Sequence, residues 1–308
     1  MQTILGASGT IGKLLAKELI PYTARVRLVC RNPVRVNESD ELFPADLFEP
    51  GAVDSAVEGS EVVYLVVGLQ YKLKVWEEEW PELMKDTIEA CLKHNARLVF
   101  FDNVYMYDKD FISDMTEETP VNPSSRKGTV RKHLNEMLFK AVKERNLNAL
   151  IARSADFYGP DNKNNFITQM VLKNLSEGKK AMWFVNPDLK HSFTYTRDAA
   201  RATALLGNTP GAYGEIWHLP TDNRKITGKE IISMAASEFG AEPKLSILPK
   251  WMLLPLGIFI PVMREMPEMM YQYDRDYFFN SSKFTKRFGI SATPYEEGVK
   301  ETCSLFRL

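Results

Sequence analysis

The amino-acid sequence predicts an α/β protein: a doubly wound parallel sheet with a smaller mixed cap toward the C-terminus. Two observations predict this class. The N-terminal third alternates between short apolar runs and amphipathic helical segments, and the glycine-rich stretch GASGTIG (6–12) directly follows the first apolar run. Strands that alternate with helices need right-handed crossovers, so the strands lie parallel and helices cover both faces of the sheet.

Each element is predicted by its own pattern. A helix is predicted from Thr10, where apolar residues recur at helical spacing, until Pro21 ends it. Further helices are expected over 50–58, 77–94 and 126–145. Buried strands are predicted at QTIL (2–5), RVRLVC (25–30), EVVYLVV (61–67), RLVFF (97–101) and NALIAR (148–153).

Composition excludes several classes of function. The 308 residues carry 39 basic and 40 acidic side chains, and this balance gives no pull toward nucleic acid or anionic lipid. The cysteines at 30, 91 and 303 lack metal-ligand spacing, and the first two are interpreted as buried reduced thiols. The longest apolar stretch (251–263) is too short to span a bilayer, and the N-terminus shows no signal pattern. We expect a cytoplasmic protein without a metal, a nucleic-acid partner or a membrane partner.

The glycine-rich stretch predicts a dinucleotide site of the Rossmann type. Gly6 permits a tight turn, Gly9 lets the backbone approach a diphosphate, and Gly12 lets the helix pack closely on the strand. The helix N-terminus offers unpaired N–H groups and the positive end of its dipole. Ser8, Thr10 and Ile11 complete the predicted cofactor-binding turn. A merely structural turn is the alternative, although one glycine would suffice for it.

The end of the second strand favours NADP over NAD. An acidic residue usually stands there and binds the adenosine ribose hydroxyls of NAD. Here VCRNP places Arg31 at that point, with Arg35 nearby, and a guanidinium can clamp a 2′-phosphate with two parallel hydrogen bonds. A solvated loop charge is the alternative interpretation of Arg31.

Five motifs are spread over about the first two-thirds of the chain: GASGTIG (6–12), ADL (45–47), VVG (66–68), RSADFYGP (153–160) and FTYTRDAARA (193–202). Through these motifs the chain resembles an extended short-chain dehydrogenase/reductase of the NAD(P)-dependent epimerase/dehydratase family. The resemblance implies that Asp46 and its neighbour Leu47 lie beside the adenine, and that Gly68 lies beside the diphosphate and ribose. It places 158–160 near the nicotinamide. It also implies a small-molecule substrate, either a carbonyl compound or a nucleotide sugar, and pairing as a homodimer.

The active-site pattern of this family is broken in this chain. Its members use a serine or threonine, a tyrosine, and a lysine four residues after the tyrosine. In TPVNPSSRKGTVRKHLNEML (119–138), Lys127 stands at the tyrosine position and Arg131 at the lysine position. Asn103, in FFDNVYMYD (100–108), stands at the serine position. The usual mechanism therefore cannot be carried over.

Five residues are candidates for the catalytic role. Asn103 can donate a hydrogen bond to a substrate oxygen, and Arg131 can bind ribose or phosphate, although its pKa is too high for acid–base work. A neighbouring cation and partial burial would lower the pKa of Lys127 and make it a general acid; a solvated lysine is the alternative. Tyr105 and Asp156 are further proton carriers, with structural packing as the alternative for each.

Two function hypotheses remain open, and a third is disfavoured. The first is an NADP-binding epimerase/dehydratase-like or reductase-like enzyme with an atypical active site. The second is a non-catalytic sensor that responds to the ratio of NADPH to NADP. RNA binding is disfavoured because the chain has no basic stripe. The dinucleotide-binding domain is predicted over 1–157, with part of 190–222 returning to it, and the cap over 158–189 and 223–308.

Overall fold

The computed structural model describes residues 1–163 and 165–306, and the chain divides into two compact units. The first unit contains the N-terminal part of the chain and two later segments that return to it. The second unit contains the segments between them and the C-terminal part. Unit 1 comprises Met1–Met106, Lys127–Ser154 and Ala199–Leu219, and unit 2 comprises Tyr107–Arg126, Ala155–Asp198 and Pro220–Leu308.

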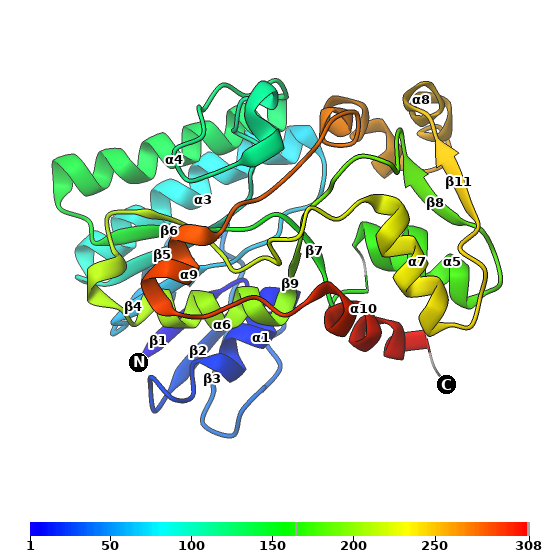
Figure 1. The fold of residues 1–308 in the computed structure, drawn as a ribbon. Helices are drawn as coiled ribbons and strands as arrows, with labels where there is room; N and C mark the ends of the chain where they lie inside the picture. The colour runs from blue at the N-terminus through cyan, green and yellow to red at the C-terminus, as the bar shows by residue number, and fades with distance from the viewer. Residues whose placement is uncertain (164, 307–308) are drawn as a thin grey trace. The chain divides into compact units, whose positions relative to one another are not determined.

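A parallel sheet of seven strands forms the centre of unit 1 (Figure 1). Its strand order is β3-β2-β1-β4-β5-β6-β10, so the order reverses between β1 and β4, as in other doubly wound folds. The predicted fold class is confirmed. The strands are β1 (Gln2–Leu5), β2 (Val26–Cys30), β3 (Glu41–Pro44), β4 (Val62–Leu65), β5 (Arg97–Asp102), β6 (Ala149–Arg153) and β10 (Ile216–His218).

Helices cover both faces of this sheet (Figure 1). The helices of unit 1 are α1 (Thr10–Glu18), α2 (Ala52–Val57), α3 (Leu73–Lys93), α4 (Arg126–Arg145) and α6 (Thr196–Gly207). Helices α2, α3 and α4 pack their apolar side chains on one face, in a core that includes Trp80, Phe100 and Leu134. On the other face, Tyr64 fits against Gly207 of α6, where a Cβ would lie 2.3 Å from the phenol oxygen.

Helix α3 begins at Leu73, earlier than the predicted 77. Its first turns carry Trp76 and Trp80, one helical turn apart and both buried, so burial extends the helix toward its N-terminus. The edge strands β3 and β10 are not among the buried strands predicted from the sequence. For β3 the reason lies in its burial. None of its four residues is fully buried, and the apolar run that identifies the other strands is therefore missing.

Unit 2 contains two short parallel strand pairs and five helices among the residues that the structure describes. Its core is aromatic and includes Trp183, Phe184 and Tyr158. A capping box between Thr227 and Glu230 fixes the start of α7. The pairs are β7 (Asp156–Tyr158) with β9 (Phe193–Tyr195) and β8 (Ala181–Phe184) with β11 (Leu245–Leu248); the helices are α5 (Lys173–Ser176), α7 (Gly228–Glu238), α8 (Leu253–Leu256), α9 (Ser282–Phe288) and α10 (Tyr295–Cys303).

The three cysteines are buried free thiols, as predicted for Cys30 and Cys91. Burial raises the pKa of Cys91 to about 12, so this thiol stays protonated at neutral pH. Within residues 1–163 and 165–306, no helix has the length and apolar character needed to cross a bilayer. The same residues contain no cluster of histidine, cysteine and carboxylate side chains that could hold a metal ion.

Candidate functional site

The turn after β1 contains three glycines, and at two of these positions the geometry allows no other residue. Gly6 has a φ of +95°, and a Cβ there would lie 2.7 Å from the Cα of Val67. A Cβ on Gly12 would lie 2.7 Å from the carbonyl oxygen of Gly6, so this glycine lets α1 pack against the turn. Gly9 differs, because its Cβ would make only an ordinary contact at 3.5 Å. Its small size is therefore not required by packing within the protein.

A cleft of about 790 Å³ opens at this turn, within unit 1. Its wall combines the loops that follow β1, β2, β3 and β4 with one side of α3. It therefore lies at the carboxyl ends of the strands, at the point where the strand order reverses, which is where doubly wound folds bind dinucleotides. Of the predicted cofactor residues, the cleft wall includes Gly6, Ser8, Gly9, Arg31, Asp46, Leu47 and Gly68.

The remaining predicted cofactor residues lie outside the wall of this cleft. Thr10 and Ile11 form the first turn of α1, and Gly12 packs beneath the glycine turn. Arg35 donates a hydrogen bond from Nη1 to the carbonyl oxygen of Glu38, at 2.5 Å. The wall also carries negative charge, since Glu79 and Glu82 of α3 contribute to it.

Arg131 lies in a buried charged cluster rather than in the cleft wall. Its guanidinium carbon lies 4.1 Å from the ring centroid of Trp80 and 4.7 Å from that of Trp76. Its Nη1 atom lies 3.4 Å from Oδ1 of Asp102. Burial lowers the pKa of Arg131, and the carboxylate of Asp102 partly opposes this effect. Aromatic faces and a carboxylate therefore hold the cation in place.

The same cluster contains a second arginine. Arg153 places Nη2 3.3 Å from Oδ2 of Asp102, and Asn135 donates a hydrogen bond to the same oxygen at 2.8 Å. The amide oxygen of Asn135 accepts a hydrogen bond from Arg153. Two guanidinium groups therefore share one buried carboxylate at the carboxyl ends of β5 and β6. The formal charge of the cluster is positive.

Three of the predicted catalytic residues, Lys127, Tyr105 and Asn103, belong to unit 1. Lys127 is fully buried, and its Nζ atom lies over the ring of Tyr71, 4.8 Å from the centroid. Tyr105 is half-buried and stacks on Trp76, with ring centroids 6.1 Å apart. Asn103 accepts a hydrogen bond from the backbone N–H of Tyr105 at 3.0 Å, which shapes the loop after β5.

Asp156 belongs to unit 2, where it pairs with a histidine. Oδ2 of Asp156 lies 2.9 Å from Nε2 of His191 and accepts a hydrogen bond from the hydroxyl of Tyr273 at 3.4 Å. The His191 ring stacks on Tyr273 and Tyr277 and is nearly completely buried. Tyr158 follows in the same strand and is also buried, and burial raises the pKa of its phenol well above the ordinary value.

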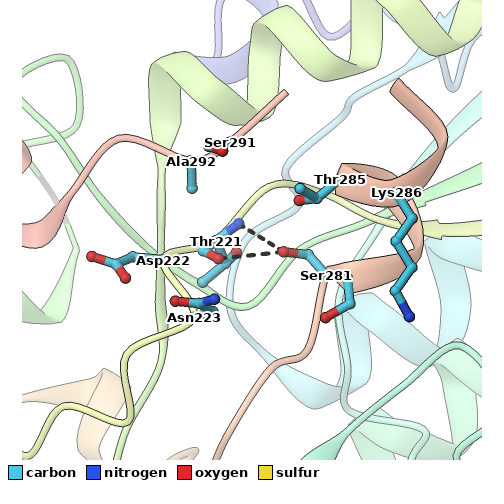
Figure 2. Close-up of a pocket in the computed structure, with 9 residues that line it drawn as sticks. Thr221, Asp222, Asn223, Ser281, Thr285, Lys286, Ser291 and Ala292 are labelled. Carbon is cyan, nitrogen blue, oxygen red and sulfur yellow. Dashed lines mark hydrogen bonds between the residues drawn. The ribbon is translucent and has the colours of Figure 1, made fainter. Parts of the chain in front are cut away.

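Unit 2 also contains a smaller polar cavity of about 270 Å³ (Figure 2). Its wall includes Asp222, Asn223, Lys286 and several hydroxyl groups. Ser281 accepts a hydrogen bond from the N–H of Thr221 at 3.1 Å, and this pair closes one side (Figure 2). No residue predicted from the sequence lies in this cavity.

Sequence reasoning missed Tyr71, and it missed the buried partners of Arg131. The available signal for Tyr71 was its place in VVGLQY, directly after a buried strand, because residues that follow parallel strands gather at the ligand-binding edge. Asp102 and Arg153 end buried strands, so the same signal applied to them. Asn135 lies within α4 and gave no such signal.

Together, the glycine turn, the strand order and the cleft at the switch point define a protein of the doubly wound α/β class, with a cleft at the place where this class binds dinucleotides. Residues 3–218 match the family model described as the NAD dependent epimerase/dehydratase family. The chain belongs to this family. No curated protein matches the sequence.

Solved structures show the same fold across the whole chain. UDP-N-acetylglucosamine 4-epimerase from Bacillus cereus has a TM-score of 0.78 at 15% identity, covering 99% of this chain and 96% of its own. UDP-glucuronic acid 4-epimerase from Bacillus cereus, in complex with NAD, has a TM-score of 0.79 at 16% identity, covering 100% and 99%. A dTDP-glucose 4,6-dehydratase from Streptomyces venezuelae, with NAD bound, has a TM-score of 0.79 at 15% identity, covering 100% and 97%. At these identities the likeness establishes the fold alone.

Proposed function

We propose that this chain is an NADP-binding enzyme of the epimerase/dehydratase or reductase type, with an active site that lacks the usual serine, tyrosine and lysine. The observation that carries the proposal is the cleft at the switch point. There, Gly6 permits the turn, Gly9 leaves the backbone open to a diphosphate, and Arg31 contributes a cation to the same space. These residues fit a nicotinamide dinucleotide, which supplies a hydride donor or acceptor when bound.

Different residues along the cleft bind different parts of the cofactor. The N–H groups at the start of α1 bind the diphosphate, since the helix dipole favours an anion there. Asp46 and Leu47 hold the adenine side, and Gly68 leaves room for the diphosphate and ribose. Arg131 contributes to the site indirectly, through the residues that it contacts, because its guanidinium is already held by Trp76, Trp80 and Asp102.

The preference for NADP rests on Arg31 and is tested by removing its charge. Replacing Arg31 by alanine should weaken NADPH binding about tenfold or more, because a charge-assisted hydrogen bond contributes roughly 1.5–3 kcal/mol, and should leave NADH binding nearly unchanged. Fluorescence titration with both reduced cofactors measures this. Asp46, Glu79 and Glu82 contribute negative charge to the same wall. The titration therefore also shows whether the positive charge of Arg31 or these carboxylates dominate the binding of the 2′-phosphate.

Arg25→Ala is the matched control, because Arg25 precedes β2 while Arg31 follows it. This control should bind both cofactors like the wild type. Equal binding of NADPH and NADH by the wild-type protein, or an equal loss of both in Arg31→Ala, would show that NADP is not preferred.

The proposed substrate is a carbonyl compound or a nucleotide sugar, with unit 2 as the substrate-binding part. Nucleotide sugars are proposed because the similar structures are named for UDP-linked and dTDP-linked sugars. A panel of both classes, assayed with oxidised and reduced cofactor, tests the proposal. Tight cofactor binding without turnover of any member would count against an enzyme.

We further propose a homodimer, which light scattering at several protein concentrations would detect.

The second candidate is a sensor of the NADPH to NADP ratio. The observation that favours it is the chemistry at the three motif positions, where Asn103, Lys127 and Arg131 replace the usual set and Arg131 is held in a buried cluster. A sensor must bind the oxidised and reduced forms with different affinity, since a ligand without differential affinity shifts no equilibrium. Equal affinities would remove this candidate.

A further inference from the structure

The phenol of Tyr71 lies beside the buried ammonium of Lys127, within unit 1. Nζ of Lys127 lies 4.8 Å from the centroid of the Tyr71 ring, and the lysine side chain is fully buried, whereas Tyr71 is partly exposed. A positive charge at 4–6 Å favours the ionised form of an acid, and low-dielectric surroundings strengthen the effect. This contact therefore acts on the proton affinity of the Tyr71 hydroxyl.

The Tyr71 ring is held in a fixed orientation. It meets the edge of Trp76 with ring centroids 5.6 Å apart and an interplanar angle of 81°. Trp76 is buried and stacks in turn on Tyr105 at 6.1 Å. The guanidinium of Arg131 lies over the same tryptophan, 4.7 Å from its centroid, so a second cation contacts this aromatic group. Preorganised charge of this kind costs no rearrangement during a reaction.

Tyr71 lies in the loop that follows β4, next in the chain to the residues of the cleft wall, although it is not itself one of them. It directly follows Val67, Gly68, Leu69 and Gln70, which all contribute to the cleft wall. In a doubly wound fold the dinucleotide crosses the switch point, so its two halves lie over the two halves of the sheet. The glycine turn and Asp46 belong to the half that contains β1 to β3. The loop of Tyr71 follows β4 and belongs to the other half.

We propose that Tyr71 is the proton-transfer residue of the reaction and that Lys127 is the positioning residue that favours its phenolate. The inference rests on the proposed function. When the substrate is oxidised, the Tyr71 phenolate would take the proton of the substrate hydroxyl, and a bound nicotinamide dinucleotide would supply the hydride acceptor for the substrate C–H bond. When a carbonyl is reduced, the Tyr71 hydroxyl returns the proton as hydride arrives. Tyr71 thus accounts for the substrate proton in both directions, and the reaction needs no other proton acceptor.

The test is a pH titration of phenolate absorbance on the protein without cofactor, compared with three variants. In the wild type, one phenol should titrate about one pH unit or more below the ordinary value near 10. This phenol should be missing in Tyr71→Phe and present in Tyr105→Phe, the matched control that packs on the same tryptophan. It should move upward in Lys127→Met, which removes the charge and retains the length of the side chain.

Circular dichroism and NADPH titration accompany each variant. Since Lys127 is fully buried, Lys127→Gln serves as the second variant if the methionine protein fails to fold. A wild-type protein in which no phenol titrates low, or a low-titrating phenol that persists in Tyr71→Phe, would overturn the inference. The titration uses neither cofactor nor substrate. A low phenol without NADPH binding would therefore contradict the proposed function alone, and NADPH binding with an ordinary phenol would contradict the role of Tyr71 alone.

Discussion

At the scale of single residues, Gly6 and Gly9 of the glycine turn after β1 are small for different reasons. Gly6 is required by the fold, since its φ is positive and a Cβ would meet the backbone of Val67. Gly9 has an extended backbone and space for a Cβ, so the protein alone does not require it. The reason for a glycine at position 9 is therefore expected to be a ligand.

Two alanine variants separate these reasons. Gly6→Ala should lower the free energy of unfolding by about 1–3 kcal/mol, through backbone strain and the contact with Val67. Gly9→Ala should change it by less than about 1 kcal/mol but weaken cofactor binding about tenfold, because the methyl group projects where the diphosphate approaches. Urea unfolding and NADPH titration measure the two effects. A Gly9→Ala protein that binds NADPH like the wild type would argue against a diphosphate at this turn.

At the scale of elements, a buried charge cluster ties the ends of β5 and β6 to α4. Asp102 ends β5, Arg153 ends β6, and both Arg131 and Asn135 come from α4. A buried ion loses several kcal/mol of hydration, so each arginine depends on the shared carboxylate or on aromatic faces. The cluster therefore fixes the helix that carries Lys127 against the carboxyl edge of the sheet.

Loss of the carboxylate should cost more stability than loss of either cation. Asp102→Asn leaves two buried guanidinium groups without an anion and should lower the free energy of unfolding by about 3–5 kcal/mol. Arg131→Met leaves Asp102 paired with Arg153 and should cost about 1–3 kcal/mol, through lost contacts with Trp76 and Trp80. Urea unfolding of both variants measures the order. The reverse order would mean that Asp102 does not balance the cluster.

Helices α3 and α4 are also joined by an exposed ion pair whose contribution depends on pH. Arg145 donates a hydrogen bond from Nη2 to Oε2 of Glu89 at 2.8 Å, and this bond lowers the pKa of Glu89. A lowered pKa stabilises the fold above the unfolded value near 4.3, and the stabilisation is lost as pH falls through the folded value. Both side chains are about half exposed, so solvent screening limits the effect to less than about 1 kcal/mol.

Glu89→Gln tests this pair by urea unfolding at neutral pH and at about pH 3. The variant should be less stable than the wild type at neutral pH by less than about 1 kcal/mol, and the difference should shrink toward zero in acid. An undiminished difference at low pH would indicate that packing rather than charge accounts for the effect.

At the scale of the whole molecule, local sequence patterns were sufficient to predict the fold and the glycine turn after β1. The apolar runs and the spacing of Gly6, Gly9 and Gly12 are contained in short segments, and the sheet and the cleft follow from them. The surroundings of Lys127 and Arg131 could not be predicted in this way. Their contacts with Tyr71, Trp80 and Asp102 join segments far apart in the sequence, and only tertiary packing brings them together.

The central claim is that the cleft in unit 1 binds a nicotinamide dinucleotide, and a binding titration tests it most directly. Calorimetry with NADPH and NADH should show one site per chain with NADPH bound more tightly. At a hundredfold excess of cofactor over its dissociation constant, the fold should gain about 2.7 kcal/mol of stability and melt at a higher temperature. If neither cofactor gives heat of binding or raises the melting temperature, the claim is contradicted.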